Sequence, residues 1–195
     1  NIGAVTPTAD QGDCQASIGF AAVTLYETEN YRQTGLLTSF SVQYALVCTN
    51  TIDCSDRRFN YTSLQRLMEI QIQEGCVPDA IVPWTASDRD AGVPPDNNVC
   101  NQAKMKAPGK VVLKSKYKAS TGTMKSWIGL NLVAGLIRAD ANFVNAVGNF
   151  IIECESNNPK DSELNWALTV VGYDKYSNWY VQNSLGTDWG NNGYS

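Results

Sequence analysis

The most informative absence in this 195-residue sequence is histidine, which occurs at no position. Histidine is the side chain whose ordinary pKa lies closest to neutral pH, and it is the commonest metal ligand and a frequent general base. A catalytic or metal site that depends on an imidazole group is therefore excluded within these residues.

Long apolar runs and an excess of positive charge are also absent. No apolar run approaches the ~20 residues that a membrane-spanning helix needs, and no signal peptide is visible. The formal net charge of −4 leaves no basic footprint for nucleic acid. No metal-ligand spacing and no phosphate-binding glycine loop occurs. We therefore expect no metal, no cofactor, no nucleic-acid partner and no membrane span.

The composition that remains is that of a globular chain. Hydrophobic residues make up 43% and charged residues 17% of the sequence, which argues against disorder. A chain of this size buries roughly 70% of its unfolded surface, and it suits one domain or two tightly packed subdomains. The six cysteines are compatible with free thiols or with three disulfides, and composition alone does not decide between them.

Helical patterns dominate the first half of the chain. We predict a helix from Ala16 to about Gln33 that ends near Gly35, a favourable residue after a helix. Its first half is apolar nearly all round, which suits a buried helix, while Glu27 and Glu29 are expected at its more exposed end. Two further helices are predicted, from Ser41 to Val47 with Ser41 as the cap, and from Tyr61 to Glu74.

The second half of the chain has the patterns of β-strands. From Gly109 onward the sequence becomes β-like, interrupted by a short helix and loop between Ser120 and Leu132. The predicted strands are Leu132–Asp140, Phe150–Cys154, Ala167–Tyr173 and Trp179–Ser184. We expect a mainly helical subdomain over about residues 10–108 and a mainly β subdomain over about 109–195.

Two motifs give the chain a resemblance to a known family. The run from Gln11 to Ala22 reads Gln-Gly-Asp-Cys-Gln-Ala-Ser-Ile-Gly-Phe-Ala-Ala. It resembles the Gln-Gly-x-Cys-Gly-Ser-Cys-Trp-Ala-Phe segment that opens the central helix of papain-like cysteine proteases of the cathepsin L and papain type. About 170 residues later, 183–194 reads Asn-Ser-Leu-Gly-Thr-Asp-Trp-Gly-Asn-Asn-Gly-Tyr. This is similar to the family's Asn-Ser-Trp-Gly-x-x-Trp-Gly-x-x-Gly-Tyr.

The resemblance spans nearly the whole chain and implies an α+β fold. A helical left subdomain would surround a long central helix, and an antiparallel, barrel-like β subdomain would face it across a cleft. We expect residues 1–195 to form one papain-like domain of this kind, with both natural termini incomplete in this sequence.

The same resemblance locates the residues that would carry protease chemistry. A papain-like site needs a thiolate, a histidine, an asparagine that orients it, and a glutamine in the oxyanion hole. Gln11 and Asn183 match the glutamine and the asparagine, but Ser17 stands at the nucleophile position and Trp166 at the histidine position. A helix N-terminus stabilises an anion by only ~0.3–2 kcal/mol, so an alcohol there needs a general base. We therefore expect a pseudoprotease that is not an enzyme.

Simpler interpretations of these residues stay open. Gln11 and Asn183 could persist because they bind local backbone, and Ser17 could be only a residue at a helix start. Two other departures agree with a changed site. Leu185 replaces the tryptophan that shields the Asn–His pair, and Cys54-Ser55-Asp56-Arg57 replaces the family's Cys-x-Gly-Gly loop, where side chains would obstruct an extended peptide.

The resemblance also implies two disulfides, Cys14–Cys54 and Cys48–Cys100. Such bridges indicate an oxidising compartment, so we expect a secreted, extracellular or lysosome- or vacuole-like location. Cys154 matches a family cysteine whose partner would follow Ser195. Cys76 has no counterpart and is a buried thiol, a partner for Cys154 or an intermolecular link.

Asn60-Tyr61-Thr62 is a glycosylation sequon, which matters only in a secreted protein.

Three functions remain in view. The leading one is an inactive protease homologue that acts by binding, as a decoy, an inhibitor or a receptor for a protein or peptide. A structural subunit of an extracellular or organellar assembly is the second. A residual or altered hydrolase that uses Ser17 is the third.

Overall fold

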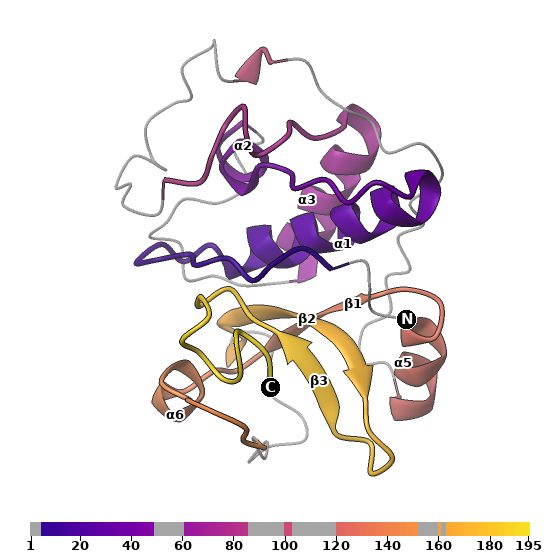
Figure 1. The fold of residues 1–195 in the computed structure, drawn as a ribbon, viewed down its shortest axis with the longest axis vertical. Coiled ribbons are helices and arrows are strands. Elements are labelled where there is room, and N and C mark those ends of the chain that lie inside the picture. The colour runs from indigo at the N-terminus through magenta and orange to yellow at the C-terminus, as the bar shows by residue number, and fades with distance from the viewer. Residues whose placement is uncertain (1–4, 49–60, 86–99, 103–119, 152–159, 161–162) are drawn as a thin grey trace.

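The computed structural model describes residues 5–48, 61–85, 100–102, 120–151, 160 and 163–195. Helices α1, α2 and α3 gather in one half of the molecule, and the β-sheet lies in the other half together with helices α5 and α6 (Figure 1). We call these the helical half and the sheet half.

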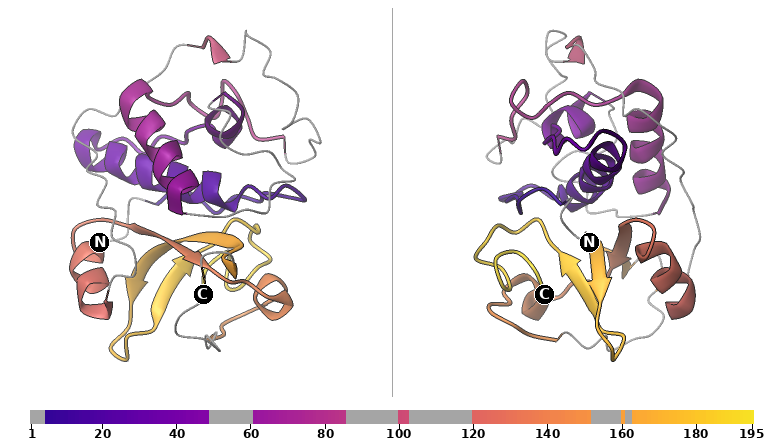
Figure 2. Two further views of the ribbon diagram at one scale, coloured as in Figure 1. Left: turned by 180° about the vertical axis from the view of Figure 1, so that it is seen from behind. Right: turned by 45° about the vertical axis from the view of Figure 1, so that its right-hand side comes forward.

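Helix α1, Ser17–Thr34, is the centre of the molecule. It packs against α2 and α3 on one side and against the sheet on the other, so few of its positions face solvent (Figure 2). This double contact explains why its first half is apolar nearly all round. It ends at Gly35, whose φ of 72° is left-handed and whose N–H bonds the Tyr31 carbonyl.

Helices α2, Val42–Val47, and α3, Tyr61–Glu74, cover the outer side of α1. Ser41 caps α2, because its hydroxyl oxygen accepts a 2.8 Å hydrogen bond from the Tyr44 N–H. Helix α3 turns Leu64 and Leu67 into the core beside α1. The amphipathic period of α3 thus places its apolar face on the central helix.

The sheet consists, in the described part of the chain, of three antiparallel strands in the order β1-β2-β3. Their bounds are Val133–Ile137, Trp166–Tyr173 and Trp179–Gln182. The middle strand β2 is buried from Trp166 to Val171. Helix α1 covers one side of it, and a second hydrophobic core, which includes Phe143 and Trp189, lies on the other. A strand buried on both faces carries a nearly continuous apolar run, as Trp-Ala-Leu-Thr-Val-Val does with Thr169 as its one polar residue.

Helices α5, Thr121–Ile128, and α6, Ala141–Val144, flank the sheet. Ser120 and Asp140 cap them by accepting backbone N–H bonds. An aromatic cluster fills the second core. The Phe143 and Trp189 ring centroids lie 5.3 Å apart, and the Phe143 and Trp166 centroids lie 6.2 Å apart.

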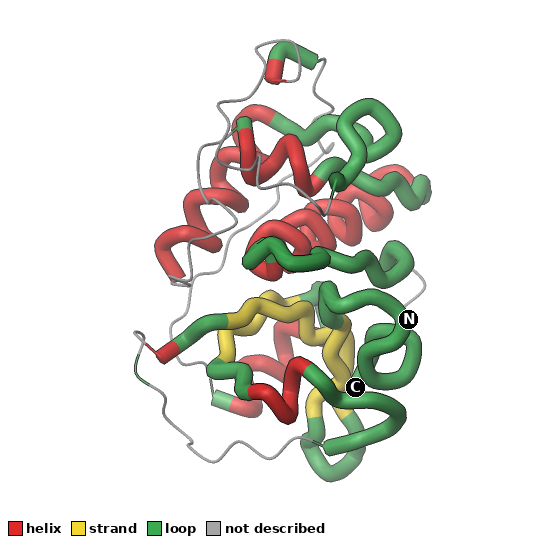
Figure 3. The backbone as a smooth tube through the Cα atoms, turned by 90° about the vertical axis from the view of Figure 1, so that its left-hand side faces the viewer, coloured by secondary structure: helices red, strands yellow, loops and turns green. Residues whose placement is uncertain are grey.

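Polar contacts join the halves in addition to the packing of α1 on the sheet. The segment that leads into α1 runs beside the C-terminal segment, where Gln11 N donates to Ser184 O at 2.8 Å and Gly186 N donates to Ala9 O at 3.0 Å. This loop pairing lies between the helices and the sheet in Figure 3.

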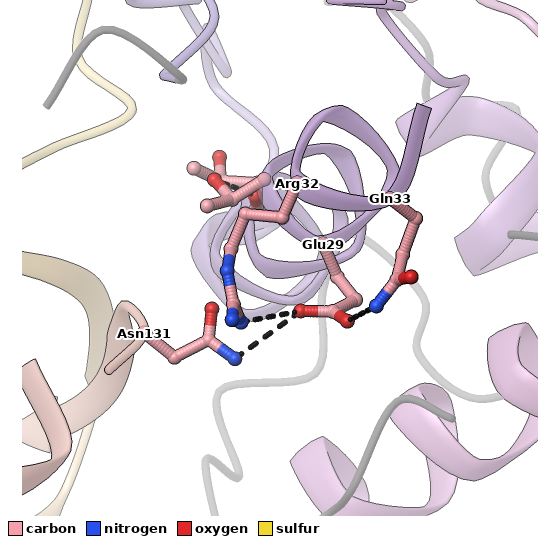
Figure 4. Close-up of polar contacts among 6 residues, drawn as sticks. Glu29, Arg32, Gln33 and Asn131 are labelled. Atoms are coloured by element: carbon pink, nitrogen blue, oxygen red, sulfur yellow. Dashed lines mark hydrogen bonds and ion pairs between the residues drawn. The ribbon is translucent and has the colours of Figure 1, made fainter. Parts of the chain in front are cut away.

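A buried carboxylate forms the second junction (Figure 4). The oxygens of Glu29 on α1 accept hydrogen bonds from Arg32 at 2.9 Å, Gln33 at 2.7 Å and Asn131 at 3.2 Å. Asn131 belongs to the turn before β1, so this cluster ties the far end of α1 to the sheet half. The prediction that Glu29 lies at an exposed end of the helix was wrong, because the sheet half covers that face.

Most predicted elements are confirmed. Helices α1, α2, α3 and α5 occupy the predicted ranges, and β2 and β3 occupy two of the predicted strands. The strand predicted from Leu132 ends earlier, at Ile137. Phe150 and Ile151 belong to no strand, and the rest of that prediction, like the β pattern after Gly109 and the subdomain boundary near residue 108, lies outside the described residues.

The cysteines follow the predictions where the structure describes them. Cys48 and Cys100 form a disulfide with Cα atoms 5.3 Å apart. Cys14 is also disulfide-bonded, and Cys76 is a free, buried thiol. The loop 54–57 with Cys54, the sequon residue Asn60 and Cys154 lie outside the described residues.

Candidate active site

Ser17 is the first residue of α1 and is completely buried. Its hydroxyl oxygen accepts a 3.1 Å hydrogen bond from the backbone N–H of Ala167 on β2. The preceding residue, Ala16, offers no side-chain cap. Ser17 is therefore more than a helix-start residue, because its hydroxyl fixes the first turn of α1 to the middle strand of the sheet.

Trp166 and Asn183, the residues at the predicted base and orienting positions, are in contact. The indole Nε1 of Trp166 donates a 2.8 Å hydrogen bond to Oδ1 of Asn183. The same oxygen accepts a second bond, of 2.9 Å, from the Ser184 N–H. Two donors on one oxygen fix the orientation of the amide and leave its Nδ2 as a donor.

Gln11, at the predicted oxyanion position, is buried and held on both sides of its amide. Its Nε2 donates to the Cys14 carbonyl at 2.8 Å, and its Oε1 accepts from the Ser184 hydroxyl at 2.7 Å. Ser184 thus connects Gln11 with Asn183. The sequence motif contains Ser184 but did not single it out, and its only signal was its place directly after Asn183.

A cavity of about 130 Å³ lies beside these residues, between α1, the N-terminal segment and the ends of β2 and β3. Ser17, Ala21, Thr24 and Glu27 line it from one side of α1, a spacing of three or four residues that a single helix face produces. At a rise of 1.5 Å per residue, Ser17 and Glu27 stand about 15 Å apart along the helix. Asn183 and Gln182 contribute to the opposite wall.

Among the residues that the structure describes, three buried side-chain atoms have no hydrogen-bond partner: Trp84 Nε1, Gln182 Oε1 and Asn183 Nδ2. All three residues line the cavity. Buried polar groups in native proteins are nearly always paired. The concentration of unpaired atoms around one cavity marks it as a place where a further molecule would find hydrogen-bond partners.

The titratable residues in the cavity wall are Glu27 and Asp79. Burial raises the pKa of Glu27 to about 7, against the opposing effect of hydrogen bonds from Thr6 and the Phe40 N–H. Burial also raises the pKa of Asp79. The expectation that Glu27 lies at an exposed end of the helix was wrong, because Thr6 of the N-terminal segment and Phe40, just before α2, pack against its carboxyl group. Periodicity within α1 carried no signal for this.

The proton chemistry at Ser17 follows from its neighbours. An indole N–H is a donor only, so Trp166 cannot accept a proton from the Ser17 hydroxyl. Among the residues that the structure describes, no group of three or more His, Cys, Asp or Glu side chains could hold a metal ion. None of the described helices is both long enough and apolar enough to cross a membrane.

Comparison with known proteins defines the class. The model of the papain family cysteine proteases, Peptidase_C1, matches residues 1–195. The chain therefore belongs to the papain family of cysteine proteases.

Among its relatives, human Cathepsin L2 is 30% identical over 208 residues, covering 98% of this chain and 57% of that protein. Mouse Testin-2 is 27% identical over 204 residues, covering 99% of this chain and 57% of that protein. The chain thus spans little more than half the length of these relatives.

Solved structures agree on the fold. The Carica candamarcensis cysteine protease CMS1MS2 in complex with E-64 has a TM-score of 0.71 and 25% identity, covering 98% of this chain and 83% of that one. The bromelain protease of Ananas comosus in complex with E64 has a TM-score of 0.68 at 25% identity and the same coverages. The predicted papain-like α+β fold is confirmed.

The prediction that the protein is not an enzyme is contradicted by these comparisons. The family is one of cysteine proteases, and the relatives include Cathepsin L2 and Cathepsin M. The prediction relied on motif positions, namely Ser17 and Trp166 in place of the nucleophile and the histidine, with Leu185 and the loop 54–57 as further departures. Motif positions show which groups were replaced. They do not show which other groups the fold brings into the same cavity, and the buried carboxyl of Glu27 is such a group.

Proposed function

We propose that this protein binds a protein or peptide segment at the junction of its two halves, beside Trp166 and Asn183. Binding of a polypeptide is common to a protease and to a recognition protein of the same fold. The proposal therefore does not depend on whether the bound chain is cleaved.

The observation that carries the proposal is the unpaired Nδ2 of Asn183. Its partner atom Oδ1 is held by Trp166 and by the Ser184 N–H, so the amide cannot turn to satisfy Nδ2 elsewhere without losing two bonds. A buried donor without an acceptor costs about 1–3 kcal/mol. A backbone carbonyl of a bound peptide is an acceptor of the kind that would complete it.

The test uses a random peptide library panned against the immobilised protein. Affinities of the selected peptides are then measured by fluorescence polarisation for the native protein and for Asn183→Asp. This variant keeps an oxygen for Trp166 and Ser184 but removes the Nδ2 donor. Asn142→Asp, at an exposed position on α6, is the control for the added charge.

We expect peptide affinity to fall at least fivefold in Asn183→Asp and to stay unchanged in Asn142→Asp. A library that yields no binding peptide, or equal affinity for the native protein and Asn183→Asp, would refute the proposed site.

Hydrolysis at Ser17 is a second candidate, supported by membership of a protease family. A fluorophosphonate probe tests it, because an activated serine oxygen displaces fluoride from phosphorus and retains the phosphonyl group. Intact mass spectrometry of the native protein and of Ser17→Ala reads the result. An adduct that requires Ser17 supports this candidate, and its absence in folded protein eliminates it.

We also propose a secreted, extracellular or lysosome- or vacuole-like location. The disulfide between Cys48 and Cys100 and the bonded state of Cys14 support an oxidising compartment. Disulfide mapping of the protein isolated from its native source under alkylating conditions tests this. Recovery of Cys48 as a free thiol would contradict it.

A further inference from the structure

Glu27 is a buried carboxyl group that forms no ion pair with any residue in the described part of the chain. It is only 4% exposed. Its Oε1 accepts a 2.7 Å bond from the Phe40 N–H, and its Oε2 accepts a bond from the Thr6 hydroxyl. In the described part of the chain, the one ion pair joins Arg32 to Glu29 and does not involve Glu27. Each carboxylate oxygen can accept at least one bond more than these.

Gln182 places a second unsatisfied acceptor in the same network. Its Nε2 donates to the Thr6 carbonyl at 2.9 Å, which orients the amide and leaves Oε1 as a buried atom without a partner. Thr6 therefore binds both Gln182, through its carbonyl, and Glu27, through its hydroxyl. Both acceptors belong to residues that line the cavity.

The group that would complete this network must donate several hydrogen bonds and carry positive charge. A primary ammonium group has three N–H donors, no acceptor and one positive charge. A bound water would satisfy single atoms but would not neutralise a buried carboxylate, and buried charges in proteins are paired.

The size and walls of the cavity limit the rest of the ligand. Its volume is about 130 Å³, and an engineered apolar cavity of about 150 Å³ in another protein holds one benzene molecule. The ligand therefore has up to about six heavy atoms. Phe40, Val42 and Leu168 also line the cavity and provide apolar surface for a short alkyl chain.

We propose that this cavity binds a small primary alkylammonium compound, with the ammonium group held by the carboxylate of Glu27 and the Oε1 of Gln182. This site is distinct from the proposed peptide contact, because its recognition groups are hydrogen-bond acceptors, whereas the peptide contact uses the Nδ2 donor of Asn183.

Binding of the ammonium group depends on pH, because it requires Glu27 to be ionised. Burial holds the pKa of Glu27 at about 7, and the ammonium ligand needs the ionised form. The other titratable groups near Glu27 are Asp79, whose charge contributes to the raised pKa, and the thiol of Cys76. The pKa of Cys76 is raised to about 12, so this thiol stays neutral throughout. Affinity is therefore expected to rise between pH 6 and pH 8.

The probe is n-butylammonium chloride, with n-butanol as the neutral compound of the same shape and sodium chloride at matched ionic strength. Isothermal titration calorimetry at pH 8 and pH 5.5 measures binding to the native protein. Glu27→Gln removes the charge at nearly constant shape, and Gln182→Met removes the amide. Asp188→Asn, at an exposed position, is the control with the same change of charge as Glu27→Gln.

We expect butylammonium to bind at pH 8 at least tenfold more tightly than at pH 5.5, and butanol to bind at least tenfold more weakly. Glu27→Gln should lose at least tenfold and Gln182→Met several-fold in affinity, and Asp188→Asn should bind as the native protein does. If Glu27→Gln does not fold, Gln182→Met and the pH dependence decide.

Three results would overturn the proposal: no butylammonium binding at pH 8, equal binding of butanol, or full competition by sodium. The last would identify a site for a simple inorganic cation. The ammonium test measures the effect of changing Glu27, and the peptide test measures the effect of changing Asn183. Either proposal can therefore be refuted while the other stands.

Discussion

The indole N–H of Trp166 donates a hydrogen bond to the side-chain oxygen of Asn183 over 2.8 Å. The two residues begin β2 and follow β3, so the bond crosses neighbouring strands at the edge of the candidate site. It holds a large ring in the aromatic core with Phe143 and fixes the direction of the Asn183 amide. Several consequences of this arrangement and of its surroundings can be measured.

Replacing Trp166 by phenylalanine keeps an aromatic ring and removes only the N–H donor and part of the ring volume. Loss of one hydrogen bond and of some packing is expected to lower the free energy of unfolding by about 1–3 kcal/mol. Urea denaturation measures it. Trp127→Phe, on the partly exposed helix α5, should change stability by less than half as much, and equal effects would contradict a special role for the bond.

Replacing Ser17 by alanine leaves the backbone N–H of Ala167 without its acceptor. Because this N–H lies in a buried part of β2, we expect a loss of about 1–3 kcal/mol in the free energy of unfolding. Urea denaturation again gives the value, with Ser126→Ala on the exposed side of α5 as the control at about zero. An unchanged midpoint in Ser17→Ala would show that the bond contributes no net stability.

Glu27 makes the folded protein less stable as pH rises, which is the opposite of the usual effect of a carboxyl group. Its pKa is about 7 in the folded protein against 4.5 as the reference value, so the folded state binds more protons than the unfolded state between these two pH values. Its contribution to stability is then fully present below about pH 4.5 and is lost as pH rises to about 7. A pKa difference of this size corresponds to roughly 3 kcal/mol in the free energy of unfolding.

Urea denaturation of the native protein and of Glu27→Gln at pH 5, 6, 7 and 8 tests this dependence. The difference in unfolding free energy between the two proteins should shift by about 2–3 kcal/mol in favour of the variant from pH 5 to pH 8. A constant difference would mean that Glu27 titrates near its ordinary pKa.

Two glycines should respond to alanine in opposite ways. Gly35 has φ of 72° with no atom near the added Cβ, so Gly35→Ala costs about 1 kcal/mol through backbone strain alone. Gly122 lies inside α5, also in open space, so Gly122→Ala should stabilise by about 0.5–1 kcal/mol. Thermal unfolding of the pair checks both signs, and a stabilising Gly35→Ala would contradict the left-handed cap.

The helices were predictable from sequence because each carried its own local signals. The signals are the apolar period of Tyr61–Glu74, the cap at Ser41 and the glycine after Thr34. Each of them depends only on residues within a few positions along the chain. The strand predicted to begin at Leu132 was shorter than expected, because the length of a strand depends on how many residues its neighbour pairs with, and β1 pairs with β2 only from Ile137 to Val133.

For the candidate site too, some features were predictable from the sequence and others were not. The motifs at residues 11–22 and 183–194, which include Gln11 and Asn183, determined the family resemblance and the papain-like fold without coordinates. Only the tertiary structure decided that Ser17 bonds Ala167, that Trp166 bonds Asn183, and that Glu27 and Glu29 are enclosed. Those facts depend on surfaces contributed by separate segments, which lie 150 residues apart for Ser17 and Ala167 and 102 residues apart for Glu29 and Asn131. Hydrophobic periodicity within one helix reports only that a face is buried, not which groups meet it.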